Sequence, residues 1–270
     1  MSLVPWPTDA LLAVGLASAG AVYAVRASRW NAMQRRVPRR WPAWQTSCFL
    51  VAMAVMFVCF STAMDRAADS SFAMHMLQHL LLLLVWAPLL LLSRPSTLAL
   101  TTAAPVWRRR WAKLLHGRPA TVLSQPIVGW LAMLVVLWAS HFSSLYESAL
   151  DHPLVHVAEH AAYIAAALLF WFPVIGGDPS RWRMSFPLRL LYLFTFVPQA
   201  AFLGAIIEQS RRVLYPHYAA TASHGSALLD QQNGGVIMWL GGAVVSLGAL
   251  LLTAAAWART ERGAAEPVSS

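Results

Sequence analysis

The sequence predicts an all-α, polytopic membrane protein with seven transmembrane helices. Of its 270 residues, 58% are hydrophobic and only 11% are charged, whereas about a quarter of the residues in a soluble domain carry a charge. Seven apolar runs reach or approach the roughly 20 residues that a helix needs to cross the hydrocarbon core of a bilayer. These runs cover residues 8–25, 43–64, 72–92, 125–141, 154–174, 188–208 and 234–257.

The basic residues predict the orientation of these helices. All but three of the 20 Lys and Arg residues lie in the segments 26–42, 93–124 and 175–189 or after residue 257. Because cytoplasmic loops are enriched in Lys and Arg, we expect the N-terminus outside and the C-terminus in the cytoplasm. The first run lacks a basic segment before it, so we expect it to remain as a helix and not to be a cleaved signal. The net charge of +9 then faces anionic membrane lipids and gives no reason to expect a nucleic-acid partner.

Two domains follow from this pattern. Residues 1–257 are expected to form the seven-helix transmembrane domain, and residues 258–270 a disordered cytoplasmic tail. Within the first domain, residues 106–119 mix Trp and Leu with five cations. That mixture predicts a short helix that lies on the cytoplasmic interface of the membrane.

Histidines gather on one side of the predicted topology. All but one of the nine lie at the outer ends of apolar runs or in outer loops, and the exception is His116. His75 and His79 form an i,i+4 pair on the third run, and His156 and His160 form another on the fifth. At 1.5 Å per residue, His79 and His160 both lie about 10 Å inside the membrane. A helical H-x-x-x-H pair can bind one metal ion, so two facing pairs could supply four nitrogen ligands.

Imidazole suits zinc, copper and iron alike, and the outer-facing position favours copper. A b-type haem held by His79 and His160 would use the same matched depth, and histidines that only hydrogen-bond within a metal-free scaffold form a third alternative. His152 lies about 12 Å along the helix from His160 and cannot share its ion, whereas Glu159 could orient an imidazole. We find no nucleophile with a base, no phosphate-binding loop and no carboxylate pair in the sequence, so we do not expect an enzyme.

Three motifs resemble the CtaG family of cytochrome c oxidase assembly proteins, the seven-span family linked to caa-type oxidases. They are "HMLQHLL" from residue 75, the "AEH" that ends at residue 160 with W-x-P after it, and "DQQNGGVIMW" from residue 230. The similarity covers roughly residues 40–255. It implies a role in the maturation of a haem-copper oxidase in the bacterial inner membrane, with the supply of copper as a metallochaperone function.

The resemblance also implies a set of site residues. His75, His79, His156 and His160 match family histidines, and so does His141 at the end of the fourth run, although "HFSSLY" here replaces the family's H-x-Pro. Asp230 matches the D-Q-Q motif. We therefore predict a copper site with His75, His79, His156 and His160 as ligands, closed by His141 and Asp230, with haem b as the alternative. The expected partners are haem-copper oxidase subunits, periplasmic copper chaperones and membrane lipids.

Overall fold

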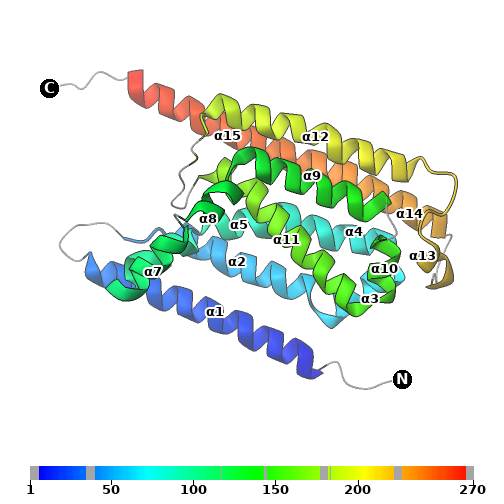
Figure 1. Ribbon diagram of the computed structural model, residues 1–270, viewed down its shortest axis with the longest axis horizontal. Coiled ribbons are helices and arrows are strands. Elements are labelled where there is room, and N and C mark those ends of the chain that lie inside the picture. The colour runs from blue at the N-terminus through cyan, green and yellow to red at the C-terminus, as the bar shows by residue number, and fades with distance from the viewer. Residues whose placement is uncertain are drawn as a thin grey trace.

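The computed structural model describes residues 6–34, 40–115, 117–142, 145–176, 182, 184–221 and 227–265. Within these residues every regular element is a helix, and most helices run side by side along the long axis of the molecule (Figure 1). The elements are α1 (Trp6–Met33), α2 (Ala43–Cys59), α3 (Thr62–Ser70), α4 (Phe72–Leu80), η1 (Leu81–Trp86), α5 (Ala87–Leu92), α6 (Pro95–Thr102), α7 (Pro105–Leu115), α8 (Arg118–Leu123), α9 (Pro126–Phe142), α10 (Leu145–Asp151), α11 (Pro153–Ile175), α12 (Phe186–Glu208), α13 (Pro216–Thr221), α14 (Ala227–Val236), η2 (Ile237–Gly241) and α15 (Gly242–Ala265).

Five helical segments are long and apolar enough to cross a membrane: Thr8–Met33, Phe72–Thr102, Pro153–Ile175, Phe186–Glu208 and Ala227–Gly263. A sixth candidate is the pair α2 and α3, which meet at an angle of 51°. The predicted fourth span corresponds to α9, an apolar helix of 17 residues. The chain is therefore a multi-pass, all-helical membrane protein, as the sequence predicted.

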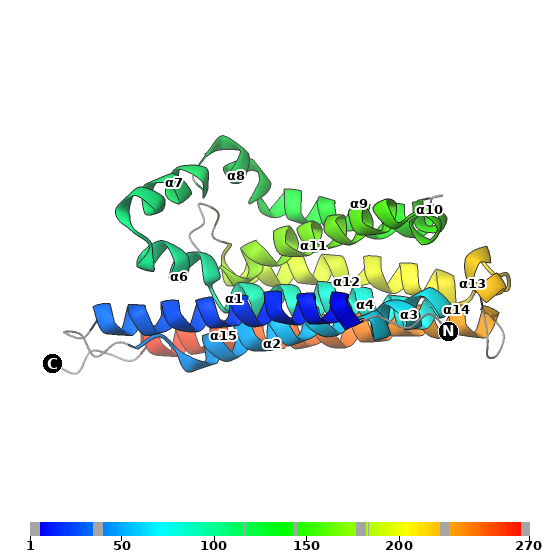
Figure 2. The same cartoon turned by 90° about the horizontal axis from the view of Figure 1, so that it is seen from below.

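The two ends of the bundle differ in the short elements that they carry. At one end lie α3, α10 and α13 together with the first turns of α4 and α11, and we call this the histidine end. At the other lie α7, α8 and the last turns of α1 and α15, which we call the arginine end (Figure 1). The helix α7 leads into α8 at this end, where both stand off from the bundle (Figure 2). The helix α1 begins at the histidine end, and α15 ends at the arginine end (Figure 1).

The apolar run predicted at residues 43–64 is divided in two. The helix α2 ends at Cys59, and Ser61 begins α3 because its hydroxyl accepts a hydrogen bond from the Met64 N–H at 3.3 Å. A serine that caps the next helix favours a new start over continuation. The amphipathic α3 then covers the histidine end of the bundle.

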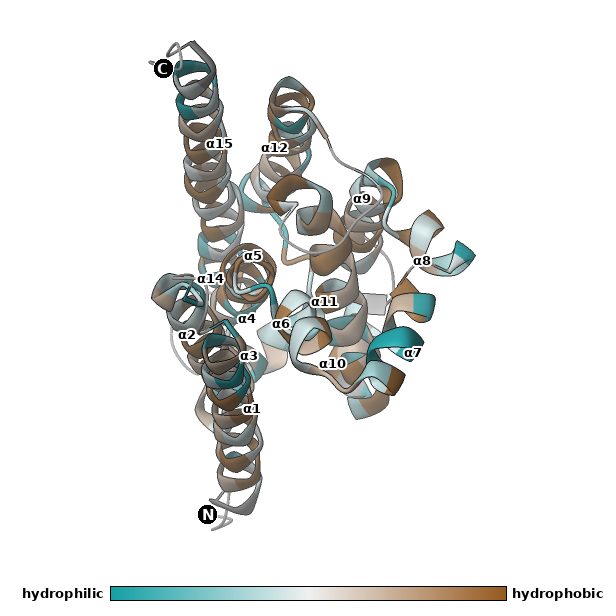
Figure 3. Cartoon of the chain, turned by 90° about the vertical axis from the view of Figure 1, so that its left-hand side faces the viewer, coloured by the Kyte–Doolittle hydropathy of each residue, from teal (hydrophilic) through white to brown (hydrophobic). Residues whose placement is uncertain are grey.

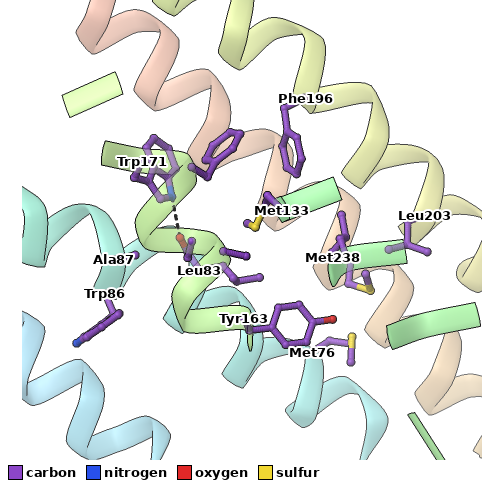
Figure 4. Packing of buried hydrophobic residues seen from close by; sticks show 14 of the residues in the cluster. Met76, Leu83, Trp86, Ala87, Met133, Tyr163, Trp171, Phe196, Leu203 and Met238 are labelled. Atoms are coloured by element: carbon purple, nitrogen blue, oxygen red, sulfur yellow. Dashed lines mark hydrogen bonds between the residues drawn. The ribbon is translucent and has the colours of Figure 1, made fainter. Parts of the chain in front are cut away.

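Two π-helical segments interrupt the spans next to the candidate site. In η1 the Ala87 N–H bonds to the Leu82 carbonyl, five residues back. The Leu83 carbonyl, which an α-helix would pair with that N–H, instead accepts the indole N–H of Trp171 on α11 at 2.8 Å (Figure 4). The π turn therefore frees a backbone acceptor that ties the third span to α11.

The core lies where α4, η1, α9, α11, α12 and η2 meet, and its buried side chains include Met76, Leu83, Met133, Phe196 and Met238 (Figure 4). The outward faces are also apolar, because many Leu, Val and Phe side chains are exposed. Hydrophobic residues occur along the long helices of the bundle (Figure 3). An apolar exterior around a packed apolar core is what a lipid environment requires.

The segment predicted as an interfacial helix is helical in α7, which leaves Trp107 and Trp111 exposed beside its arginines. Its position on a membrane surface stays a prediction. Residues 258–265, which the sequence analysis assigned to a disordered tail, instead continue α15. Ala, Arg and Glu are good helix formers, and the indole of Trp257 donates to Glu261 at 3.0 Å along this stretch. Residues 266–270 of the predicted tail lie outside the described residues.

Candidate metal centre

The two histidine pairs face each other at the histidine end of the bundle. His75 and His79 are on α4, and His156 and His160 are on α11. The ring centroids of His79 and His160 lie 5.2 Å apart, and those of His75 and His156 lie 5.6 Å apart. The matched depths inferred from the sequence thus correspond to neighbouring side chains.

Three of these imidazoles converge on one point. Ligand-capable nitrogens of His75, His79 and His160 all lie within 4.8 Å of one another, and all three residues are buried. The Nε2 atoms of His75 and His79 are 3.1 Å apart. Two nitrogens that bind one tetrahedral ion at about 2.0 Å each are separated by roughly 3.3 Å, so this pair has the spacing of two ligands on one metal.

The tautomer of His160 follows from its surroundings. Its Nδ1 lies 3.2 Å from the carbonyl oxygen of His156, one turn earlier in α11. Because a carbonyl only accepts, Nδ1 carries the proton in the neutral ring and Nε2 carries a lone pair. That Nε2 is buried and has no hydrogen-bond partner among the described residues. A backbone hydrogen bond on one ring nitrogen that leaves the other free is the arrangement found at metal-binding histidines.

Two tyrosines hold His75 in place. The Tyr218 hydroxyl lies 2.9 Å from Nδ1 of His75, and the Tyr146 hydroxyl lies 3.1 Å from that of Tyr218. Burial raises the pKa of both hydroxyls above their usual range, so both stay protonated. No signal in the sequence predicts these two residues, because a tyrosine in a short connecting helix shows no periodicity or motif that points to the site.

A second group of ligands adjoins the first and shares His75 with it. Ligand atoms of His75, His156 and Glu159 also lie within 4.8 Å of one another. Nε2 of His156 and both carboxylate oxygens of Glu159 are shielded from solvent and have no hydrogen-bond partner in the described part of the chain. A shielded carboxylate is costly without a positive partner, and a cation between these three groups would supply one.

An open pocket of about 560 Å³ leads to the cluster between α3 and α11. Asp65, Arg66 and Asp69 line it from α3, and His156 and His160 line it from α11. Two carboxylates against one guanidinium leave the α3 side of the pocket with a net negative charge, which favours the approach of a cation.

The other predicted ligands lie outside this cluster. Both oxygens of Asp230 accept hydrogen bonds at the start of α4, from the Ser71 hydroxyl at 2.7 Å and the Phe72 N–H at 2.6 Å. Nε2 of His141 lies 3.3 Å from Sδ of Met76, and His141 belongs to neither ligand group. His152, which was predicted to lie too far from His160 to share its ion, is exposed at the start of α11.

His217 lies 3.5 Å from the Asp69 carboxylate at the rim. His116 and His224 lie outside the described residues.

The D-Q-Q-x-G-G segment positions the first turn of α4. Besides the Asp230 cap, the side chain of Gln231 accepts from the Leu214 N–H at 2.6 Å and donates to the Arg212 carbonyl at 3.1 Å. A Cβ on Gly234 would collide with the ring of Phe72, and one on Gly235 would lie 2.6 Å from the Glu208 backbone nitrogen. The motif therefore lets α14 approach α4 and α12 closely and fixes the helix that carries His75.

A bundle of membrane-spanning helices around converging imidazoles defines a multi-pass membrane protein with a candidate metal centre. Residues 21–260 match the family described as cytochrome c oxidase caa3 assembly factor (Caa3_CtaG). The chain belongs to this family, which confirms the resemblance found in the sequence and points to a non-catalytic role.

Related proteins occur in mycobacteria. Uncharacterized proteins of Mycobacterium bovis and Mycobacterium tuberculosis are each 27% identical over 270 residues, which is 96% of this chain and 40% of theirs. An uncharacterized protein of Mycobacterium leprae is 23% identical over 237 residues, which is 84% of this chain and 36% of its own. The chain thus spans less than half the length of these relatives. No solved structure matches it.

Proposed function

We propose that this protein binds copper between α4 and α11 and handles it for the maturation of a haem-copper oxidase in the bacterial inner membrane. The observation that carries the proposal is the convergence of His75, His79 and His160 within 4.8 Å. His156 and Glu159 extend the site toward the open pocket. The ligand set supports a transition-metal ion, and the link of the family to oxidase assembly supports copper as that ion.

The topology belongs to the same proposal. We count seven spans by taking α2 with α3 as one span and by including α9. In this arrangement the N-terminus and the histidine end lie outside, and the arginine end lies in the cytoplasm. The support is the concentration of Lys and Arg in the segments at the arginine end, which is typical of cytoplasmic loops. On this arrangement the open pocket faces the periplasm, where copper chaperones and the exposed domains of oxidase subunits are accessible.

Copper fits the ligand arrangement better than the haem alternative. A b-type haem needs two imidazoles on opposite faces of a flat macrocycle. Here the Nε2 atoms of His75 and His79, from one helix, lie 3.1 Å apart, and His160 completes a compact triangle. A single ion between three nitrogens, with Glu159 nearby to offset its charge, suits this triangle. Imidazole ligands are compatible with both copper and zinc, and the oxidase connection selects copper.

The test is metal analysis of detergent-purified protein after anaerobic loading with Cu(I), with the absorption spectrum recorded on the same sample. We expect near-stoichiometric copper and no Soret band. The double variant His75→Ala/His160→Ala should lose binding at this centre, and its capacity for Zn(II) should fall to background. His152→Ala, which removes an exposed histidine of the same helix, is the matched control and should bind as the wild type does. Undiminished Zn(II) and Cu(I) binding in the double variant, or a Soret band with iron, would overturn the proposal.

A further inference from the structure

A small cavity of about 50 Å³ lies inside the bundle, apart from the open pocket. Three methionines line it from three elements, Met76 on α4, Met133 on α9 and Met238 on η2, together with the rings of His79 and His141. Figure 4 shows the three methionines turned toward the same region beside Tyr163. One water needs about 10–15 Å³ of such space, so the cavity has room for an ion.

The environment of His141 defines its tautomer. Nδ1 lies 2.8 Å from the Leu137 carbonyl and 3.0 Å from the Ser140 hydroxyl. Because the carbonyl can only accept, Nδ1 carries the proton in the neutral ring. The lone pair of Nε2 is then directed at Sδ of Met76, 3.3 Å away. A thioether has no proton to donate, so two buried electron-pair donors face each other without a donor hydrogen between them.

A cation between Nε2 of His141 and Sδ of Met76 would accept both electron pairs and turn this unfavourable contact into a favourable one. With bonds of about 2.0 Å to nitrogen and 2.3 Å to sulfur, two ligands of one tetrahedral ion lie roughly 3.5 Å apart, close to the observed 3.3 Å. Met133 and Met238 place further thioethers at the same cavity. Nδ1 of His79, whose ring also lines the cavity, is buried and has no hydrogen-bond partner among the residues described.

We propose that this cavity is a second metal site, selective for a soft monovalent cation, with Nε2 of His141 and Sδ of Met76 as ligands and Met238 and Met133 completing the shell. Thioether sulfur selects Cu(I) and its analogue Ag(I) over Zn(II). His141, which the sequence analysis assigned to the histidine centre, belongs to this site. The inference rests on the proposed function only in taking copper as the physiological metal. Because α4 carries ligands of both sites, a Cu(I) ion would have a second, buried binding position beside the histidine centre.

The test uses the full chain in detergent, loaded anaerobically with Cu(I) or with Zn(II), and read by metal content and by X-ray absorption at the copper edge. The wild type should bind more Cu(I) than Zn(II), with a sulfur scattering shell at about 2.3 Å. Met76→Leu/Met238→Leu should lose that shell and the extra copper while keeping Zn(II). The control Met184→Leu changes a methionine that is equally buried but does not line the cavity, and it should keep both.

The two proposed metal sites can be tested independently of each other. In His75→Ala/His160→Ala the sulfur shell should persist while Zn(II) binding is lost, so that result supports the second site even if the first is redefined. Copper with only nitrogen or oxygen neighbours in the wild type would overturn the second site and leave the histidine centre intact. If the double methionine variant does not fold, Met76→Leu alone should weaken the sulfur signal, and an unchanged signal in this single variant would also overturn the proposal.

Discussion

Both ends of the bundle carry polar side chains. Those of the histidine end point into the protein, whereas those of the arginine end point out of it. At the histidine end His75, Gln78 and Gln231 are at most 1% exposed. At the arginine end the arginines of α7 are exposed, and Arg110 lies over the exposed ring of Trp107. Inward polarity carries a desolvation cost that hydrogen bonds or ligands must offset, whereas outward polarity only meets water or headgroups. The direction of the polar side chains, more than their number, therefore locates a site in a membrane protein.

The largest effect is expected from two matched glycines in the last span. A Cβ on Gly235, at the histidine end, would lie 2.6 Å from the Glu208 backbone nitrogen and 2.7 Å from the Gly204 carbonyl. Gly235→Ala must therefore shift the backbone, and we expect a loss of about 3 kcal/mol of stability. Gly248, further along α15, has nothing within 4 Å, and Gly248→Ala should gain about 1 kcal/mol because alanine favours the helix.

The melting temperatures of both glycine variants in detergent measure these changes in stability. Equal melting temperatures would mean that the close packing of α14 against α12 does not hold the histidine end together.

An intermediate effect is expected at Asp230. Asp230→Ala removes the acceptor of two hydrogen bonds at the start of α4, and loss of such a cap costs about 1–2 kcal/mol. It should also weaken copper binding, since His75 lies in the first turn of that helix. Asp230→Asn keeps an acceptor and should restore most of the stability and binding. If copper titrations found that Asp230→Asn weakens copper binding as much as Asp230→Ala does, the carboxylate charge would be required and Asp230 would be a metal ligand.

The smallest effect is expected at the arginine end. The Tyr23 hydroxyl donates to the Ser93 carbonyl at 2.6 Å and accepts from the Trp41 indole at 3.1 Å. Tyr23→Phe removes these bonds at constant shape and should cost about 1 kcal/mol. Copper stoichiometry should not change, because this network lies apart from both proposed metal sites. A loss of bound copper in Tyr23→Phe would contradict this expectation and show that the arginine end affects the metal sites.

The sequence was sufficient to locate the long helices and the main cluster. Apolar length alone found the runs at 72–92 and 154–174, because hydrocarbon thickness sets a minimum for any span. The spacing of His75 with His79 and of His156 with His160 then fixed the face and depth of each pair. These inferences needed only the period of a helix.

The remaining features depend on contacts between distant segments. His141 turned out to face Met76 on another helix, and that contact depends on the rotation of α9 about its axis. Asp230 caps a helix that begins 158 residues earlier in the chain, and no local pattern announces such a pairing. The break after Cys59 could have been found, since Ser61 is a residue that favours the start of a helix.

The π turn in η1 has a consequence for how this span can vary. A π turn accommodates one residue more than the α-helix that would join the same neighbours, and each α-helical residue rotates the following side chains by about 100°. Deletion of one residue between Leu81 and Trp86 would therefore let the span become a regular α-helix with His75 and His79 in their present orientation relative to α5. The same deletion in a regular α-helical part of the span would turn the two histidines by about 100° relative to α5. The π turn is thus the place where this span can lose one residue without turning its ligands away from α11.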